Sequence, residues 1–331
     1  MVVSSRHYSK FFKFTFVKNI VGIQELPTTK TKIKSMHEPV LIKEVISTLD
    51  PQAGDSLLDA TAGYGGHSAE ILSITNNYTE SVLVDRDKKA HDYLKDKFKR
   101  TGIKFMRMDF LLAAKTLENE TQQFNLILAD LGVSSPHLDI ASRGFSFKAD
   151  GPLDMRMDQT QELTAEIIVN QWPEQEIAKI IKIYGEEPMA RRIAKSIVDG
   201  RPFTTTNQLA QNIADVARRK GSKKHPATKT FQALRIAVNN ELGLLTEVLP
   251  FWYDLLAPGG RLAVITFHSL EDRIVKQYFK ENGGDRYDAK LKILTKNPLT
   301  ASSDELVFNP RSRSAKLRVV AKINNHRKDQ R

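Results

Sequence analysis

The residues best suited to binding a cofactor are a glycine-rich turn at residues 59–67 and the acidic residue Asp85 that follows it. Gly65 and Gly66 in this turn allow the backbone to approach a ligand closely. Asp85 ends an apolar run about 20 residues after the glycines, where a carboxylate can bind two ribose hydroxyls. The alternative for Asp85 is a cap at a strand end or an ion pair with Arg86. Together, the turn and the acid favour a cofactor that contains ribose.

Asp109 and Phe110 add a third candidate for the same site. Phe110 can pack on an adenine ring and Asp109 can accept a hydrogen bond from its amino group; the alternative places Phe110 in the core. NAD would also fit a glycine-rich turn followed by an acid. However, the turn departs from the G-x-G-x-x-G spacing and has no Arg or Lys to bind a pyrophosphate. A methyl donor needs neither feature, so an NAD-dependent oxidoreductase is the weaker alternative.

Short apolar segments alternating with helical ones indicate how these residues are positioned. We expect strands at residues 56–60, 81–85, 104–108 and 124–130, with helices at about 67–73 and 88–99. This alternation is typical of a doubly wound α/β fold with a parallel sheet. In such sheets, ligands bind beyond the carboxyl ends of the strands. Asp85 and Asp130 each end one of these segments, so we expect them at the same edge.

The alternation stops after residue 138. Residues 164–218 are expected to form several helices, and strand-like sequence returns only at residues 260–267. We therefore predict a catalytic domain of residues 36–138 and 226–331, interrupted by a mainly helical insertion domain of residues 139–225. Apolar residues at helical spacing should lead the chain back into the sheet: Phe231, Leu234, Val238, Leu242 and Leu245.

The composition limits the chemistry. The chain has no cysteine, which excludes disulfides, thiolate zinc sites and cysteine nucleophiles, and we expect no metal site. The absence of cysteine also argues against methyl transfer that needs a thiolate nucleophile, and against radical methylation, which needs iron–sulfur clusters. No apolar run reaches the roughly 18 residues of a membrane helix, so we expect a soluble protein. Direct transfer to an amino nitrogen or a hydroxyl is compatible with the composition.

The net charge of +11 is unevenly distributed. Residues 1–35 contain seven Lys or Arg and one acid, which leaves +5 for the remainder. The charge of the remainder is therefore weak support for a nucleic-acid partner. We interpret residues 1–35 as a disordered basic extension, or as sequence upstream of a working start at Met36. The alternative is an organelle transit peptide, which the single arginine disfavours.

From Met36 to about Arg318, the sequence resembles the bacterial 16S ribosomal RNA cytosine-N4 methyltransferases, which have relatives in organelles. The matching blocks occur in order along the chain: GGHS at residues 65–68, DRD at 85–87, DLGVSSP at 130–136, RGFSF at 143–147, DGPLDMRMD at 150–158, YGEE at 184–187, HPATKTFQALRI at 225–236, LAPGGRL at 256–262, FHSLEDRIVK at 267–276 and NPRSRSAKLR at 309–318.

The resemblance implies a class I methyltransferase domain with a helical insertion that helps to bind substrate. It implies S-adenosylmethionine as cofactor and methylation of the exocyclic N4 of a specific cytosine in the decoding region of 16S ribosomal RNA. The implied cofactor-binding residues are Gly65, Gly66, His67, Asp85, Phe110, Asp130 and His137. Relatives often have Gln at the last position, and either side chain can form hydrogen bonds. The alternative function is an inactive RNA-binding factor for ribosome assembly with the same fold.

Transfer to a cytosine amino group requires an acceptor for its hydrogen bonds, because the nitrogen lone pair is delocalised into the ring. Asp130 is the first candidate for this catalytic role, although it can equally hold the amino group of the methionine part of the cofactor. The hydroxyls of Ser134 and Ser135 can assist. The Pro-Pro-aromatic signature of many amino methyltransferases is absent at this place.

Candidates for RNA contact are two aromatic residues and a set of basic ones. Phe145 and Phe147 can stack on a base drawn out of the RNA, or they belong to the core of the insertion. The basic candidates can bind phosphate, and the alternative for them is a solvated loop: Lys223, Lys224, Lys229, Arg311 and Arg313. Ser269 and Asp272 are expected to form a helix capping box.

The resemblance implies the small ribosomal subunit as partner and a cytoplasmic location. An organellar location is the alternative if residues 1–35 are a transit peptide. The oligomeric state stays open between a monomer and a homodimer, and no membrane partner is expected.

Overall fold

The computed structural model of the chain describes residues 39–217, 225–284 and 287–324. The interpretations of residues 1–35 and of Lys223 and Lys224 concern sequence outside these ranges. No helix in the described ranges has both the length and the apolar character needed to cross a membrane.

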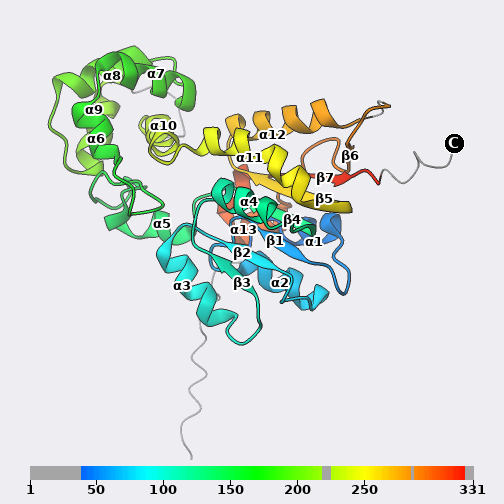
Figure 1. Cartoon of the computed structure of the whole chain (residues 1–331). Coiled ribbons are helices and arrows are strands. Elements are labelled where there is room, and N and C mark those ends of the chain that lie inside the picture. Colours follow the sequence, from blue (N-terminus) through cyan, green and yellow to red (C-terminus); the bar gives the residue numbers. More distant parts are fainter. Residues whose placement is uncertain (1–38, 218–224, 285–286, 325–331) are drawn as a thin grey trace, which may run out of the picture. The chain divides into compact units, whose positions relative to one another are not determined.

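A seven-stranded sheet has the order β3-β2-β1-β4-β5-β7-β6 (Figure 1). Strands β1 to β5 run parallel to one another, whereas β7 runs antiparallel to both β5 and β6. The strands are β1 (Leu57–Asp59), β2 (Val82–Val84), β3 (Lys104–Met106), β4 (Phe124–Asp130), β5 (Leu256–Thr266), β6 (Leu291–Ile293) and β7 (Lys316–Lys322). The four strands predicted up to residue 130 are therefore confirmed, with ends that differ by one or two residues.

Helices cover both faces of this sheet. Successive side chains along each strand point to opposite faces, so each strand packs against both layers of helices. Ile127 of β4 and Val264 of β5 pack in the cluster of α4 (Phe110–Asn119), α11 (Glu241–Leu255) and α12 (Ser269–Asn282). Their neighbours Leu128 and Ile265 pack on the other face, with α1 (Ile42–Leu49), α2 (Gly66–Thr75) and α3 (Lys88–Lys97). Because both faces are buried, the strands read as continuous apolar runs rather than alternating ones.

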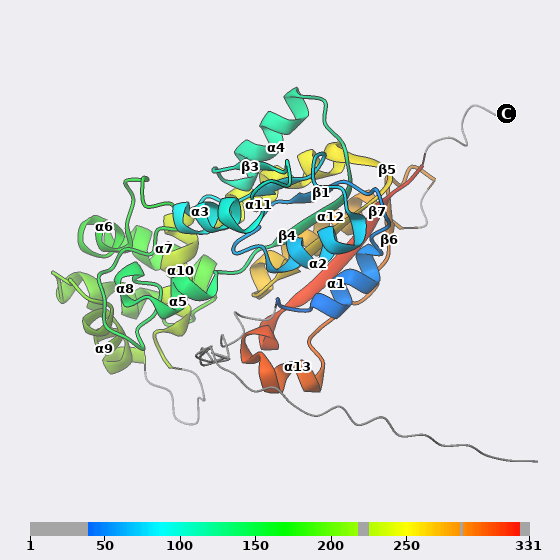
Figure 2. The same ribbon diagram turned by 90° about the horizontal axis from the view of Figure 1, so that it is seen from below.

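A third cluster consists mainly of helices and lies beside the sheet in Figures 1 and 2. Its helices are α6 (Ala165–Gln171), α7 (Glu174–Gly185), α8 (Ala190–Asp199), α9 (Thr206–Ala217) and α10 (Thr228–Asn239); the short α5 (Ser135–Asp139) leads toward them. Ile181, Ile193 and Ile213 are fully buried in this cluster. We refer to these buried residues and helices α6 to α10 as the helical cluster.

Helix α10 packs in the helical cluster and not on the sheet. Phe231, Leu234 and Val238 of α10 are buried there, whereas Leu245 of α11 packs against the sheet. The chain passes between the two at Asn240, whose φ of 48° is left-handed. Judged by packing, the chain thus passes from the helical cluster to the sheet at Asn240, later than the predicted boundary at residue 225.

The capping box at the start of α12 uses different residues from those predicted. The side chain of His268 accepts from the Glu271 backbone N–H, and Glu271 Oε2 accepts from the His268 backbone N–H at 3.2 Å. Asp272 forms ion pairs with Arg318 at 2.7 Å and with Lys316 at 3.1 Å. The prediction of Ser269 and Asp272 was wrong by one position because histidine, with a ring nitrogen as acceptor, takes the cap.

Candidate active site

Three acidic residues lie at the carboxyl ends of adjacent parallel strands. Asp59 ends β1, Asp85 follows β2 and Asp130 ends β4, and β1 pairs with both β2 and β4. The Asp130 backbone N–H donates to Thr61 Oγ1 at 2.6 Å, which joins the end of β4 to the turn after β1. This edge of the sheet is where ligands bind in such folds.

Asp85 is held by two backbone donors. Oδ2 accepts from the Gly63 N–H at 2.8 Å, and Oδ1 accepts from the Asp87 N–H at 2.7 Å. Burial raises the pKa of Asp85, while these two hydrogen bonds oppose the rise. Each carboxylate oxygen has a second lone pair, so two ribose hydroxyls can still be accepted. The alternative, an ion pair with Arg86, is not among the described contacts; Arg86 donates instead to the Asn239 carbonyl at 3.4 Å.

The glycines of the turn are explained by backbone conformation and packing. Gly65 has a φ of +65°, and a Cβ there would lie 2.8 Å from the Phe98 ring and 2.9 Å from Leu94. A Cβ on Gly66 would lie 2.8 Å from Pro39. Both positions therefore need glycine without any ligand. Their contact with the cofactor stays a prediction, supported by their place at the start of α2, where backbone N–H groups are free to donate.

Asp130 carries a buried acceptor. Its Oδ1 has no hydrogen-bond partner among the residues that the structure describes. Burial raises the pKa of Asp130 to about 7, opposed by the Gly132 backbone N–H and reinforced by the charge of Glu271. A buried acceptor without a donor is costly, so a ligand that donates to it would be favoured.

His67 lies between the N-terminal segment and Asp130. Its Nε2 lies 2.8 Å from the Val40 carbonyl oxygen, which can only accept, so Nε2 carries the proton. Nδ1 is then an acceptor, 3.8 Å from Asp130 Oδ2. Burial lowers the pKa of His67, which favours this neutral form. Burial also raises the pKa of nearby Asp59 to about 6, although the Ser68 hydroxyl donates to that carboxyl at 2.5 Å.

Asp109 and Phe110 open α4. Oδ1 of Asp109 accepts from the N–H groups of Leu111 and Leu112, each at 2.9 Å, so Asp109 is the N-cap of the helix. The Phe110 ring packs on Trp252, with centroids 5.5 Å apart. Phe110 is only partly buried, so both interpretations of its ring, core packing and adenine contact, are compatible with this position.

His137 uses both ring nitrogens within the protein. Nε2 lies 2.7 Å from Asp87 Oδ2, and Nδ1 lies 3.0 Å from the hydroxyl oxygen of Ser134. Its ring also stacks on Phe145, with centroids 4.9 Å apart. A direct contact of His137 with the cofactor stays a prediction and would need a change in these partners. The side chain of Ser135 lies outside the described part of the structure.

Comparison with known proteins identifies the family and the activity of the chain. The chain matches the model of the MraW methylase family over residues 34–323. It belongs to the MraW methylase family. The methyltransferase activity, the S-adenosylmethionine cofactor and the class I methyltransferase fold predicted from the sequence are thereby confirmed.

Relatives match over nearly their full length. Ribosomal RNA small subunit methyltransferase H of Synechococcus elongatus is 47% identical over 291 residues, covering 87% of this chain and 95% of the relative. The protein of the same name from Heliobacterium mobile is 45% identical over 310 residues, covering 87% and 99%. A solved structure of a methyltransferase homolog from Pyrococcus horikoshii has a TM-score of 0.42 and 14% identity, covering 87% of this chain and 67% of that one.

The aromatic candidates for RNA contact in this MraW methylase are engaged in packing. Phe145 is 8% exposed; its ring stacks on His137, and the Arg143 guanidinium lies 6.0 Å from its ring centroid. Phe147 packs edge-on against Phe231 at 4.8 Å between centroids. The core interpretation therefore fits Phe145, because little of its surface is exposed and it packs in the helical cluster. Phe147 is partly buried, and its stacking role stays a prediction.

The basic candidates lie on two elements. Lys229 of α10 donates to the Glu186 carbonyl at 2.8 Å. Arg311, on the short helix Pro310–Ser314, pairs with Asp139 at 2.6 Å, and Arg313 on the same helix is exposed. Nearby, α13 (Ser303–Phe308) presents Phe308 with 80% of its surface exposed, a residue that the sequence pattern did not single out. The contacts of Lys229, Arg311 and Arg313 with RNA stay predictions.

Glu241, His268 and Glu271 have potential metal ligands within 4.8 Å of one another, but their protons and partners do not fit a cation. His268 Nδ1 accepts from a backbone N–H, so Nε2 carries the proton and faces Glu271 Oε1 at 3.2 Å. Arg235 binds both oxygens of Glu241 at 2.9 and 2.8 Å. Glu241 is thus paired with Arg235, and His268 and Glu271 hold each other at the start of α12.

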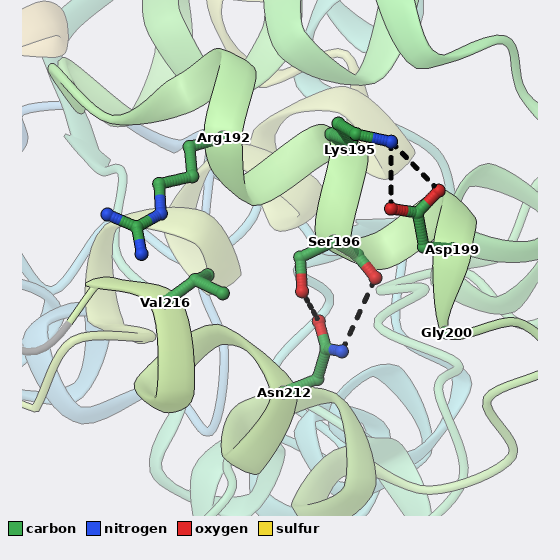
Figure 3. Close-up of a pocket in the computed structure, with 7 residues that line it drawn as sticks. All are labelled: Arg192, Lys195, Ser196, Asp199, Gly200, Asn212 and Val216. Atoms are coloured by element: carbon green, nitrogen blue, oxygen red, sulfur yellow. Dashed lines mark hydrogen bonds and ion pairs between the residues drawn. The ribbon is translucent and has the colours of Figure 1, made fainter.

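A hollow of about 370 Å³ lies between α8 and α9 in the helical cluster (Figure 3). Its polar groups pair with each other: Lys195 binds Asp199 at 2.9 Å, and Ser196 donates to Asn212 at 3.0 Å. None of its lining residues comes from the strand ends, so this hollow is separate from the methyltransferase site.

Proposed function

We propose that the chain transfers a methyl group from S-adenosylmethionine to the exocyclic N4 of a specific cytosine in the decoding region of 16S ribosomal RNA. The relatives named as small-subunit methyltransferases support the ribosomal substrate, because they match 87% of this chain. The observation that carries the choice of an amino nitrogen is the buried acceptor of Asp130, Oδ1, which lacks a donor among the described residues.

An amino group suits this acceptor for a geometric reason. The cytosine amino group has two hydrogens, and its nitrogen lone pair is delocalised into the ring. A carboxylate that accepts one hydrogen fixes the orientation of the nitrogen and increases electron density on it. The same carboxylate can accept the proton that N4 loses when the new nitrogen–carbon bond forms. Asp130 therefore acts as hydrogen-bond acceptor first and as base afterwards, while Ser134 holds the ring of His137 nearby.

The residues at the strand ends fit the methyl donor. Asp85 would bind the ribose hydroxyls, and the partly buried Phe110 would contact the adenine. His67 and the turn with Gly65 and Gly66 would lie beside the methionine part. When bound, S-adenosylmethionine supplies a methyl group on a positively charged sulfur. Burial raises the pKa values of the three acidic residues gathered here, and that positive charge would favour their ionised forms.

A substitution separates the two roles open to Asp130. Asp130→Asn keeps the shape but removes the base. We expect methyl transfer to small ribosomal subunits to fall by about 10²–10³, as for loss of one electrostatic group, with the Kd for S-adenosylmethionine changed less than about threefold. A much weaker Kd with unchanged turnover at saturation would assign Asp130 to the methionine amino group instead. Asp92→Asn, at an exposed position on α3, is the control.

Tritium transfer from labelled S-adenosylmethionine to small ribosomal subunits tests the function itself. We expect label in the RNA and none in the ribosomal proteins. Binding to the subunits without any transfer would favour the inactive assembly factor. Asp85→Ala should lose both cofactor binding and transfer while it retains RNA binding.

We also infer a cytoplasmic site of action, because the relatives that support the ribosomal substrate are bacterial. An organellar site is the alternative if residues 1–35 are a transit peptide. N-terminal sequencing of the native protein distinguishes a start at Met1 from one at Met36 or a processed end. Sedimentation would determine whether the protein is a monomer or a homodimer.

A further inference from the structure

Three buried ionisable side chains meet beside the site and take no part in the methyl-transfer step proposed above. Asp87 Oδ2 accepts from Arg143 Nη1 at 2.7 Å and lies 2.7 Å from His137 Nε2. The exposed fractions of the side chains of Asp87, His137 and Arg143 are 8%, 7% and 3%. Although burial alone would raise the pKa of Asp87, the bonds to His137 and Arg143 hold it below its usual range. We call these three residues the Asp87 cluster.

On one side, the Asp87 cluster is continuous with the cofactor loop. The Asp87 backbone N–H donates to Asp85 Oδ1 at 2.7 Å, the carboxylate expected to hold the ribose. Asp87 Oδ1 also accepts from the Lys89 N–H at 2.8 Å and so caps α3. A shift of Asp87 would therefore also displace Asp85, the acid proposed to bind the ribose.

On the other side, the Asp87 cluster is joined to the helical cluster. Arg143 Nη2 donates to the carbonyls of Arg156 and Met157 at 2.9 and 3.0 Å. The Met157 N–H donates to Asn239 Oδ1 at 2.8 Å, and Asn239, at the end of α10, also donates to the Met155 carbonyl. These bonds connect the DRD, RGFSF and DGPLDMRMD blocks through one arginine.

Stability alone does not explain buried charges of this kind. A well-packed apolar group of similar volume often stabilises a fold as much as a buried ion pair does. However, a buried cation that donates to groups on two different segments holds those segments in one relative geometry. The single Arg143 guanidinium contacts Asp87 after β2 and two carbonyls of the 154–158 loop, and so holds the two segments together.

We propose that Asp87, His137 and Arg143 couple binding of the methyl donor at Asp85 to the position of the helical cluster that binds the RNA. They are positioning residues, not catalytic ones. Donor binding that fixes Asp85 also fixes Asp87, and Asp87 fixes the helical cluster through Arg143. The two ligands then bind with positive coupling, which is reciprocal. This inference rests on the proposed function, since it takes ribosomal RNA as the second ligand.

The coupling is measured with S-adenosylhomocysteine, which has no methyl group to transfer. Its Kd is determined for the full chain alone and with saturating small ribosomal subunits. For the wild type we expect subunits to tighten binding at least about fivefold, the lower end of typical couplings. For Arg143→Met we expect a ratio within about twofold of one, with the Kd of the free protein changed less than about threefold. An unchanged ratio in Arg143→Met, or no coupling in the wild type, would overturn the proposal.

A matched pair at position 137 keeps the test decisive if Arg143→Met does not fold. Gln can donate from Nε2 to Asp87 and accept at Oε1 from Ser134, whereas Leu can do neither. We expect His137→Gln to retain the coupling and His137→Leu to lose it; equal ratios in the two variants would contradict a positioning role. Asp87→Asn tests the carboxylate separately, because Asn keeps the cap on α3 but has a single acceptor oxygen.

Lys88→Ala, at an exposed position next to Asp87, is the control and should leave the ratio unchanged. Failure of the wild type to methylate RNA would contradict the proposed function alone, because the coupling is measured without methyl transfer. If the wild type methylates RNA normally but shows no coupling, this inference alone would be contradicted.

Discussion

At the scale of single residues, the site is defined by how much each acid is buried and by what donates to it. Asp85 has two backbone donors, and Asp87 has two side-chain partners, the ring of His137 and the guanidinium of Arg143. Asp130 has one oxygen for which no donor is described. In the functions proposed above, the same residue type serves three purposes: Asp85 would bind hydroxyls, Asp87 would position an element and Asp130 would accept a proton. Neighbouring donors, not residue identity, decide among them.

The raised pKa of Asp130 predicts how the rate depends on pH. Burial raises this pKa to about 7, and only the ionised carboxylate can accept from the amino group. As pH falls below this value the carboxylate becomes protonated, so kcat/KM should fall about tenfold per pH unit and should level off above it. Methyl transfer to small ribosomal subunits, measured from about pH 5.5 to about pH 8.5 in buffers of constant ionic strength, gives this profile.

An inflection near the ordinary value of a carboxyl group would contradict this account of Asp130. The Asp92→Asn control should give the wild-type profile, because Asp92 lies exposed on α3. The Asp130→Asn variant should show no inflection near neutrality in its remaining activity.

At the scale of elements, helix starts hold the residues that surround the site. Asp87 caps α3, Asp109 caps α4 and His268 caps α12. Each of these residues follows a strand, so the chain turns into a helix just beyond the carboxyl edge of the sheet. Capping residues thus fix the directions of the segments that carry Asp85, Phe110 and Glu271.

The cap of α4 predicts a pair of stability effects. Asp109→Ala leaves the N–H groups of Leu111 and Leu112 without their shared acceptor and should lower the free energy of unfolding by about 1 kcal/mol. Asp109→Asn keeps an acceptor oxygen and should stay within about 0.5 kcal/mol of the wild type. Denaturant unfolding measures both. Equal losses in the two variants would show that the charge of Asp109, and not the cap, matters.

At the scale of the whole molecule, the sequence predicts the sheet well and the packing of the helices less well. Apolar runs such as residues 124–130 are short, continuous and bounded by turns, so β4 has the predicted limits. The glycine turn and Asp85 could be predicted because their chemistry is local in sequence. The pairing of Asp87 with Arg143 could not, because it joins residues 56 positions apart through two loops.

Helix α10 shows the same limit. Its apolar residues have helical spacing, but spacing alone does not say which cluster they enter. Phe231 and Leu234 pack with α6 to α9, and only after Asn240 does the chain return to the sheet. Phe145 was open between stacking on RNA and core packing for a similar reason: an aromatic residue beside a site looks the same in sequence whether its ring is buried or exposed.

The identity of the methylated nucleoside tests the central claim most directly. Small ribosomal subunits lacking the modification are incubated with the protein and S-adenosylmethionine, and the RNA is digested to nucleosides for mass spectrometry. We predict N4-methylated cytidine from a single position, formed about 10²–10³ times more slowly by the Asp130→Asn variant. A methyl group on cytosine C5 or on a ribose, with none on N4, would contradict the assignment of Asp130 as the acceptor for an amino group.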